Sequence, residues 1–336
     1  MPKPNTQIIV EIAQAHDGSL GILHSYIDAV ARTGADAIKF QTHIAEAESS
    51  IHEPFRVKFS YEDDTRYDYW DRMGFTEEQW VGIKDHCEEV GLEFMSSPFS
   101  IEAVEMLDRI GMKRFKIASG EVSNFLMLEK IARTGKPILL SSGMSSYAEL
   151  DETIAFLKTF GNPLSIFQCT TAYPTQAQEV GLNVIPEMLE RYQIPVGLSD
   201  HSGEIFAPLA AVSLGASLLE FHAVFHKEMF GPDAKASLTF DQITELVRGV
   251  RFIDQSLNHP IDKGDNQKFQ SLKAMFGKSL AVRQDLPEGH MLTREDLESK
   301  KPAGQGISTT EFEQVVGRKT QRPLKKFQFL TEEDLA

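Results

Sequence analysis

Short apolar segments alternate with stretches of helical periodicity from residue 8 to about residue 257. Eight of these segments are candidates for strands that are buried on both faces, because they are nearly continuously apolar. They span residues 8–13, 37–42, 93–98, 115–119, 137–142, 164–170, 195–200 and 218–223. Eight strand-helix units in roughly 250 residues match the count and size of a closed (β/α)₈ barrel. We therefore predict an α/β protein built on a TIM barrel.

The helical stretches between these strands carry their own start and stop signals. Thr76 with Gln79 and Ser146 with Glu149 have the spacing of capping boxes. Glycines stand where helices would end, a position that favours the left-handed backbone; they are Gly34, Gly91, Gly111, Gly135, Gly161 and Gly215. A doubly wound open sheet is the alternative, but it usually has fewer strands, and the first predicted turn is no GxGxxG motif.

The regular alternation stops near residue 260. Residues 261–277 are rich in polar side chains and are interpreted as a linker. Residues 278–336 form short segments separated by turns at 287–289 and 303–306, which is typical of a compact small domain. The predicted organisation is a barrel over 1–260, a linker over 261–277 and a small domain over 278–336.

Composition narrows the functional classes. The chain has 336 residues, 41% hydrophobic, with a formal net charge of −15 that argues against nucleic acid as a partner. A few buried lysines could still bind a phosphate. Cys87 and Cys169 lie far apart and outside any CxxC motif, so a reducing compartment fits best. No apolar stretch approaches the ~20 residues of a membrane span and no signal-like segment is seen, so we expect a cytoplasmic protein that does not bind membranes.

Two lysines interrupt the apolar pattern of predicted strands. Lys39 lies within AIKFQT and Lys116 within FKIAS. A buried ammonium group needs an anionic partner, because an unpaired buried charge costs several kcal/mol. That partner could be a neighbouring glutamate, a bound phosphate or carboxylate, or the lysine could form a Schiff base.

Two histidines follow or end neighbouring predicted strands. His201 stands beside Asp200, and His222 follows Glu220 by two positions. Imidazoles bind divalent transition metals, and only two of them with open positions suits a catalytic rather than a structural site. Asp233, in the loop after the last strand, could also face the barrel mouth.

As an ordered set, the motifs resemble the N-acetylneuraminate (sialic acid) synthase family, which includes the pseudaminic and legionaminic acid synthases. The matching stretches are EIAQAHDGSL, GADAIKFQTH, FMSSPFS, FKIASGE, PILLSSGM, QCTTAYPT, GLSDHS, LLEFHAVF and GPDAKASL. The C-terminal segment is similar to the family's antifreeze-like (SAF) domain, through KSLAVRQDLPEGHMLTREDLESKKPAGQGIS and VVGRK. The resemblance covers essentially the whole chain.

The resemblance implies a transferase that condenses phosphoenolpyruvate with an open-chain N-acetylated hexosamine, such as N-acetylmannosamine, and releases phosphate. By motif position, phosphoenolpyruvate would be held by Lys39, Ser97, Lys116, Ser119, Ser141 and Ser199, and Mn²⁺ by His201 and His222. Glu11, Gln41, Tyr173 and Asp233 would face the sugar or the reacting water. Thr171 stands where the family often has asparagine.

One departure from the family pattern lies in the C-terminal domain. Bacterial members commonly have Arg-Pro-Gly there, and the arginine reaches a partner subunit's site in a homodimer. This chain has Lys301-Pro302-Ala303, which keeps the charge and loses the planar guanidinium fork. The substitution leaves the acceptor sugar open.

Three alternatives stay open at this point. A Schiff-base aldolase on the same barrel would need no metal. A related phosphoenolpyruvate-dependent synthase would use a phosphorylated aldose as its acceptor. The C-terminal domain could instead make the chain an ice- or glycan-binding protein with a vestigial barrel, although the four charged or metal-binding residues Lys39, Lys116, His201 and His222 argue against it.

Overall fold

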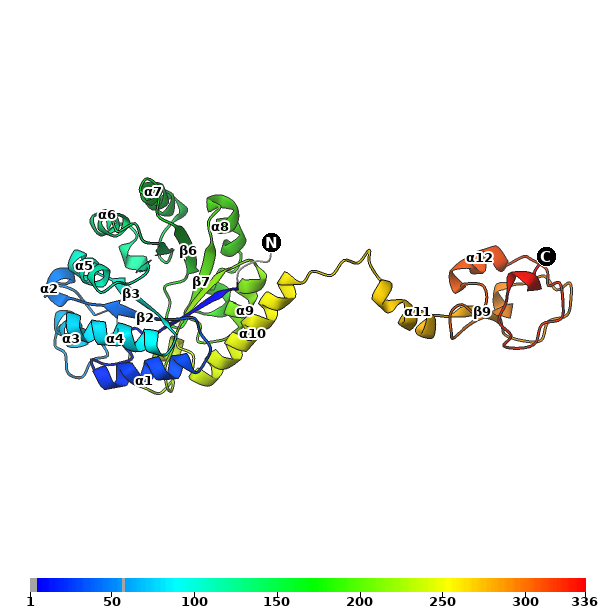
Figure 1. The fold of residues 1–336 in the computed structure, drawn as a ribbon, viewed down its shortest axis with the longest axis horizontal. Coiled ribbons are helices and arrows are strands. Elements are labelled where there is room, and N and C mark those ends of the chain that lie inside the picture. The colour runs from blue at the N-terminus through cyan, green and yellow to red at the C-terminus, as the bar shows by residue number, and fades with distance from the viewer. Residues whose placement is uncertain (1–4, 56–57) are drawn as a thin grey trace. The chain divides into compact units, whose positions relative to one another are not determined.

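The computed structural model describes residues 5–55 and 58–336, which divide into two compact units, residues 1–260 and 261–336 (Figure 1). In the first unit, helices surround a ring of parallel strands. No helix in the described part of the chain is long and apolar enough to cross a membrane.

Eight parallel strands form the sheet of the first unit. They are β1 (Gln7–Glu11), β2 (Ala37–Thr42), β3 (Glu93–Pro98), β4 (Phe115–Ile117), β5 (Ile138–Ser141), β6 (Leu164–Cys169), β7 (Val196–Asp200) and β8 (Leu218–His222). Their hydrogen-bonded order is β3-β2-β1-β8-β7-β6-β5-β4, and β3 packs beside β4 at the closure. The structure thus confirms the predicted eight-stranded barrel, and the open doubly wound sheet was the wrong alternative.

Eight helices follow the eight strands in turn. In chain order they are α1 (Leu20–Ala31), α4 (Glu77–Glu89), α5 (Ile101–Arg109), α6 (Phe125–Ala132), α7 (Tyr147–Lys158), α8 (Val184–Tyr192), α9 (Phe206–Ser213) and α10 (Phe240–Asn258). Both predicted capping boxes are present, at the starts of α4 and α7. All six predicted helix-ending glycines have positive φ. Local start and stop signals therefore decided these boundaries.

The barrel interior changes character along its axis. Ile9, Met95, Leu139, Phe167 and Leu218 form an apolar cluster with Ala37 inside the ring. The residue two positions later on each of these strands lies on the same face, because side chains of a strand alternate. Those later residues are Glu11, Lys39, Ser97, Ser141, Cys169 and Glu220. An apolar floor thus supports a polar layer at the carboxyl ends of the strands.

The connection from β2 to α4 is longer than the others and has its own structure. It contains α2 (Ala45–Glu48) and α3 (Arg66–Met73). A small aromatic core of Tyr69, Trp70 and neighbouring phenylalanines packs within it. Arg72 of α3 donates hydrogen bonds to the carboxylates of Asp63 and Asp17, which ties this segment to the loop after β1.

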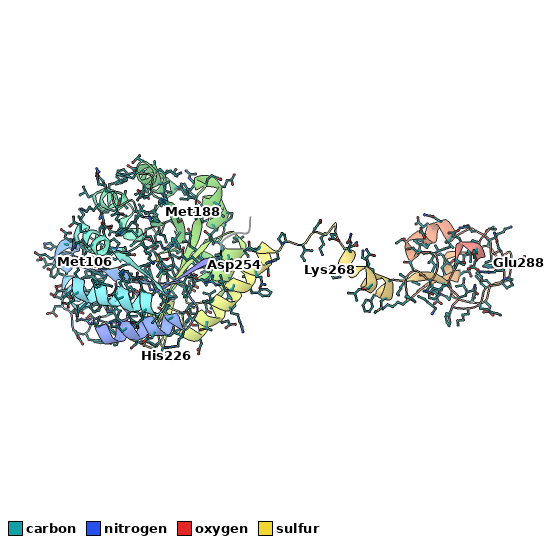
Figure 2. All side chains as sticks on the ribbon, viewed as in Figure 1. Met106, Met188, His226, Asp254, Lys268 and Glu288 are labelled. Atoms are coloured by element: carbon teal, nitrogen blue, oxygen red, sulfur yellow. The ribbon has the colours of Figure 1, made fainter. Side chains whose placement is uncertain are left out.

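The second unit has a core of its own (Figure 2). Strands β9 (Ser279–Val282) and β10 (Leu297–Lys300) pair antiparallel, and α12 (Phe312–Val315) follows. The segment predicted as a linker is not unstructured throughout, since α11 (Gln270–Phe276) lies within it. Its helical pattern is only seven residues long, too short to stand out in the sequence.

Candidate active site

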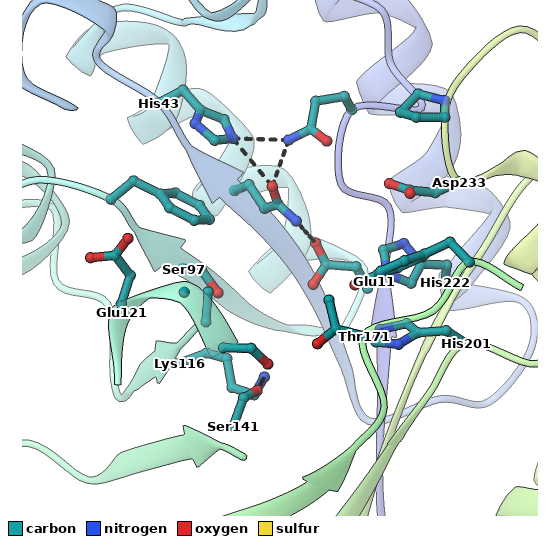
Figure 3. Close-up of a pocket in the computed structure, with 18 of the residues that line it drawn as sticks. Glu11, His43, Ser97, Lys116, Glu121, Ser141, Thr171, His201, His222 and Asp233 are labelled. Atoms are coloured by element: carbon teal, nitrogen blue, oxygen red, sulfur yellow. Dashed lines mark hydrogen bonds between the residues drawn. The ribbon is translucent and has the colours of Figure 1, made fainter. Parts of the chain in front are cut away.

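A cavity of about 430 Å³ lies at the carboxyl ends of the barrel strands. Thirteen of the fourteen residues singled out in the sequence line it (Figure 3). They are Glu11, Lys39, Gln41, Ser97, Lys116, Ser119, Ser141, Thr171, Tyr173, Ser199, His201, His222 and Asp233. They come from every strand or from the loop that follows it, as expected for a barrel active site.

The two lysines share one buried carboxylate. Lys116 Nζ lies 3.0 Å from Glu220 Oε1, and Lys39 Nζ lies 3.9 Å from the same oxygen. Ser199 Oγ also donates to this oxygen, at 3.1 Å. The first of the three options raised by the sequence, a salt bridge to a glutamate, is therefore present without a ligand. Lys39 also forms an ion pair with Glu11, so without a ligand the two lysines face two carboxylates at the floor of the cavity.

Serine hydroxyls lie beside the two lysines and add hydrogen-bond donors to this part of the cavity. Lys39 Nζ donates to Ser97 Oγ at 3.2 Å, and Lys116 Nζ donates to Ser141 Oγ at 2.6 Å. Each hydroxyl keeps its own proton to donate to an anion. Buried ammonium groups with hydroxyl donors beside them are the chemistry that binds a phosphate or carboxylate.

Burial and mutual repulsion set the ionisation of these groups. Burial, together with the nearby Lys116 ammonium, lowers the pKa of Lys39 to about 7, although Glu220 opposes the change. Burial alone would raise the pKa of the Glu220 carboxyl, but Lys116 and Lys39 outweigh it and hold that pKa below its usual range. A bound dianion would stabilise the charged form of Lys39 and raise the pKa of its ammonium group.

Glu11 is held by two neighbours at the end of β1. Its Oε2 forms an ion pair with Lys39, and its Oε1 accepts a hydrogen bond from Gln41 Nε2 at 3.1 Å. The residue is 1% exposed. A carboxylate fixed in this way at the cavity wall is placed to accept a proton or to stabilise a positive charge.

The two histidines lie together in the cavity, with ring centroids 5.2 Å apart (Figure 3). His201 Nδ1 is 2.9 Å from the Thr170 carbonyl oxygen, so it donates there and leaves Nε2 to bind a cation. Burial would lower the pKa of His201, but hydrogen bonds with Cys169 and with the Thr170 carbonyl outweigh it and raise that pKa. Among the described residues no three His, Cys, Asp or Glu side chains form a metal cluster. These two imidazoles could hold a divalent cation only together with further ligands such as substrate or water.

The remaining predicted residues surround this pair. The Tyr173 ring lies 4.2 Å from that of His201 and 5.9 Å from that of His222, between centroids. Thr171 and Ser119 approach the backbone of Gly143 so closely that an added Cβ there would lie 2.4 and 2.5 Å from their hydroxyl oxygens. Glycine is required at that position because only it leaves both hydroxyls in place.

Lys301 is the one predicted site residue outside the barrel unit. It lies in the second unit, where its Nζ is 5.0 Å from the Phe276 ring centroid. Its role at an active site stays a prediction.

Several lining residues were missed from the sequence, and most belong to the β2–α4 connection. They are Gln14, Glu48, Glu53, Phe55, Phe59, Arg66, Tyr69, Trp70, Phe99 and Met144. The signal that could have found them is the length of this connection and its aromatic content. Long connections in compact domains commonly form functional loops.

Comparison with known proteins agrees with this architecture. Residues 26–262 match the NeuB family and residues 277–336 match the SAF domain. An N,N′-diacetyllegionaminic acid synthase of Campylobacter jejuni is 31% identical over 333 residues, 97% of this chain and 99% of the relative. An N-acetylneuraminate-9-phosphate synthase of Homo sapiens is 33% identical over 322 residues, 93% of this chain and 88% of the relative.

A solved structure shows the same fold. The N-acetylneuraminic acid synthetase of Leptospira borgpetersenii superposes with a TM-score of 0.71 at 27% identity, covering 80% of this chain and 90% of that one. The family match spans most of the barrel and the relatives extend through the second unit. The chain with this buried lysine pair and histidine pair therefore belongs to the NeuB family and carries a C-terminal SAF domain.

Proposed function

We propose that this protein is a nonulosonic acid synthase. It would join phosphoenolpyruvate to the open-chain aldehyde of an N-acetylated hexosamine such as N-acetylmannosamine, releasing phosphate and a 2-keto-3-deoxy acid. The observation that carries the proposal is the pair Lys39 and Lys116 buried around Glu220, in one cavity with His201 and His222. The relatives' own names, which are those of sialic-type acid synthases, point to the same chemistry.

The lysine floor, which consists of Lys39, Lys116 and the serines beside them, would hold phosphoenolpyruvate. Its phosphate and carboxylate would be bound by Lys39 and Lys116 and by the hydroxyls of Ser97, Ser119, Ser141 and Ser199. Glu220 neutralises part of the lysine charge before binding. It would then hold both ammonium groups in place while the ligand accepts hydrogen bonds from them.

His201 and His222 would hold a divalent cation, proposed as Mn²⁺, which supplies Lewis-acid polarisation of the sugar aldehyde when it is bound. Gln41, Tyr173 and Asp233 would orient the sugar from the cavity wall. Thr171 lies near Ser119 and would contact bound substrate in the cavity.

The reaction then follows from the placement of these side chains. The methylene carbon of phosphoenolpyruvate attacks the aldehyde carbon, and the π electrons of the aldehyde C=O bond move to its oxygen, which takes up a proton. Positive charge develops at the second carbon of phosphoenolpyruvate. Water adds at that carbon, and Glu11, held by Gln41, accepts a proton from the water or stabilises the charge. The carbon–oxygen bond to phosphate breaks, and the lysine-serine floor receives the leaving phosphate.

The test is phosphate release by metal-stripped protein with phosphoenolpyruvate, with and without Mn²⁺, against free and phosphorylated N-acetylated hexosamines. We expect release only when metal and one acceptor are both present. The control is Lys116→Met, which removes a phosphate ligand and should abolish release. Absence of release with every acceptor, by folded wild-type protein with metal, would overturn the proposal.

A Schiff-base aldolase is the one alternative that a specific observation supports. A pKa of about 7 would leave part of Lys39 as the free amine near neutral pH. Its contacts with Glu11 and Ser97 instead hold its nitrogen as a donor. Borohydride trapping of a lysine in the presence of substrate, without metal, would decide for the aldolase.

We further propose that the protein acts as a homodimer in which Lys301 reaches the partner subunit's cavity. The support is the SAF domain match and the resemblance of this segment to the arginine-bearing turn of the family. A single ammonium group would contact the sugar as a point charge, where a guanidinium would bind it through two parallel hydrogen bonds.

A further inference from the structure

We propose that His43 is a positioning residue that orients the Glu11 carboxylate through a hydrogen-bonded relay of two glutamines. The relay runs from Glu48 through His43, Gln14 and Gln41 to Glu11 along one wall of the cavity. Figure 3 draws its part from His43 to Glu11, including a direct contact of His43 Nε2 with Gln41 Oε1 at 3.2 Å. The arrangement is a feature of the protein without substrate. Its effect on rate rests on the proposed function.

The contacts of the relay are continuous. His43 Nδ1 is 2.7 Å from Glu48 Oε1, and His43 Nε2 is 2.9 Å from Gln14 Nε2. Gln14 Nε2 also lies 2.6 Å from Gln41 Oε1, and Gln41 Nε2 lies 3.1 Å from Glu11 Oε1. The five residues come from the loop after β1, from β2 and its following segment, and from the end of β1.

The hydrogen-bonding capacity of each group selects one arrangement of protons. An ionised carboxylate only accepts, so His43 carries its proton on Nδ1 and donates it to Glu48. His43 Nε2 is then an acceptor and takes one N–H of Gln14, whose second N–H goes to Gln41 Oε1. With its oxygen so engaged, Gln41 must turn its amide nitrogen toward Glu11.

The opposite tautomer would break the relay at two points. If His43 carried its proton on Nε2, that N–H could donate to Gln41 Oε1, 3.2 Å away, but it would also lie against the N–H groups of Gln14, 2.9 Å away between nitrogens. Nδ1, without a hydrogen, would then face the Glu48 carboxylate at 2.7 Å, an unfavourable contact of two acceptors.

The imidazole of His43 is stacked between two aromatic rings. The Trp70 ring stacks on one face with centroids 3.8 Å apart and 13° between planes, and Phe99 stacks on the other at 4.5 Å and 14°. The side chain of His43 is 3% exposed. The two aromatic rings fix the plane of the imidazole, and its hydrogen bonds to Glu48 and Gln14 fix where each nitrogen lies in that plane.

The relay gives Glu11 a defined orientation for the proposed reaction. Gln41 holds Oε1 while Lys39 holds Oε2, so neither oxygen is free to rotate away from the reacting water. Misplacement of a catalytic group by about 1 Å costs up to about 10²-fold in rate. His43 touches Glu11 only through the glutamines, so its contribution should appear in kcat.

Two variants separate hydrogen bonding from packing. His43→Phe keeps a flat ring between Trp70 and Phe99 but has no nitrogen, whereas His43→Gln places an amide oxygen near the position of Nε2 and loses the ring. We expect His43→Phe to lower kcat about 10²-fold and His43→Gln about tenfold. KM for phosphoenolpyruvate should change less than about threefold in both, because only Lys39 among the residues proposed to bind it contacts the relay, and it does so at Glu11. A greater loss in His43→Gln than in His43→Phe would show that His43 only packs, and would overturn the proposal.

A matched pair on α2 tests the far end of the relay. Glu48→Leu removes the acceptor that holds Nδ1–H, and should lower kcat about tenfold with little change in KM for phosphoenolpyruvate. Glu46→Leu lies on the same short helix, is exposed, and should leave kcat unchanged. Equal rates for the two variants would exclude Glu48 from the relay and overturn the proposal.

A measurement on the ligand-free protein keeps this test separate from the proposed function. The imidazole ¹⁵N chemical shifts of His43, assigned with the His43→Phe variant, report which nitrogen carries the proton. We expect the Nδ1–H tautomer in wild-type protein and its loss in Glu48→Leu. An Nε2–H tautomer would overturn the relay even if the enzyme is active, whereas the expected tautomer in a protein that releases no phosphate would overturn only the proposed reaction.

Discussion

At the scale of single residues, the barrel carries charged side chains where its interior is otherwise apolar. Lys116 and Glu220 are each 5% exposed or less, and their ion pair links strands β4 and β8. A buried pair contributes little net stability, but removal of one partner leaves the other charge uncompensated. The buried lysines agree with the anion binding proposed above, and Glu220 compensates their charge in the protein without ligand.

Lys116→Met alone should destabilise the protein more than Lys116→Met combined with Glu220→Gln. We expect a loss of about 3 kcal/mol in the free energy of unfolding, because the Glu220 carboxylate loses its closest cation. Lys116→Met/Glu220→Gln should recover part of that loss while remaining inactive. Urea unfolding followed by tryptophan fluorescence measures this, since Trp70 and Trp80 both lie in the barrel unit. Equal stability of Lys116→Met and wild-type protein would refute the charge-compensation argument.

At the scale of elements, local signals were sufficient where the chain follows ordinary strand-helix units. The capping boxes at Thr76 and Ser146 and the apolar strands predicted the element boundaries within a few residues. The β2–α4 connection was different, since α2 and α3 are short and stabilised by aromatic packing and by the Arg72 ion pairs. Periodicity over four to eight residues gives no clear signal, so this wall of the cavity could not be predicted.

Two glycine variants should have opposite effects. Gly197 in β7 faces the barrel interior, where an added Cβ would lie 2.6 Å from the Phe167 ring and 2.7 Å from the Leu218 carbonyl oxygen. Gly197→Ala should cost about 2 kcal/mol through overpacking. Gly82→Ala, on the exposed face of α4 with no atom within 4 Å of the new Cβ, should stabilise the protein by about 0.5–1 kcal/mol. The same urea unfolding measures both, and a neutral Gly197→Ala would show that Phe167 moves aside freely.

At the scale of the whole molecule, the two units have separate hydrophobic cores. The barrel supplies every lining residue of the cavity among the residues described. Lys301 lies in the second unit, and the action proposed for it depends on a second copy of the chain. Subunit mixing therefore tests the homodimer and the role of Lys301 together.

Two inactive variants should restore activity when they are mixed. A Lys116→Met subunit has an inactive barrel site and an intact Lys301. A Lys301→Met subunit has an intact barrel site and lacks the Lys301 ammonium group. If Lys301 acts across the dimer, each mixed dimer has one complete site, and random mixing should recover about a quarter of wild-type phosphate release. Co-expression with two affinity tags isolates the mixed species. Activity no higher than the sum of the parents would place the action of Lys301 within its own subunit or outside the site.

The amino-acid sequence was enough to predict the number of strands, the barrel and the lysines, serines and histidines that line its mouth. Buried parallel strands appear as apolar runs, so a charged residue within such a run is conspicuous, and the parity of a strand places residues two apart on one face. Only the tertiary structure decided which side chains meet. Lys116 and Glu220 are 104 residues apart, and Glu11 meets His43 only through Gln41 of β2, which His43 contacts directly and through Gln14 of the loop after β1. Such contacts depend on strand order, register and side-chain direction across the whole barrel, which no local pattern in the chain encodes.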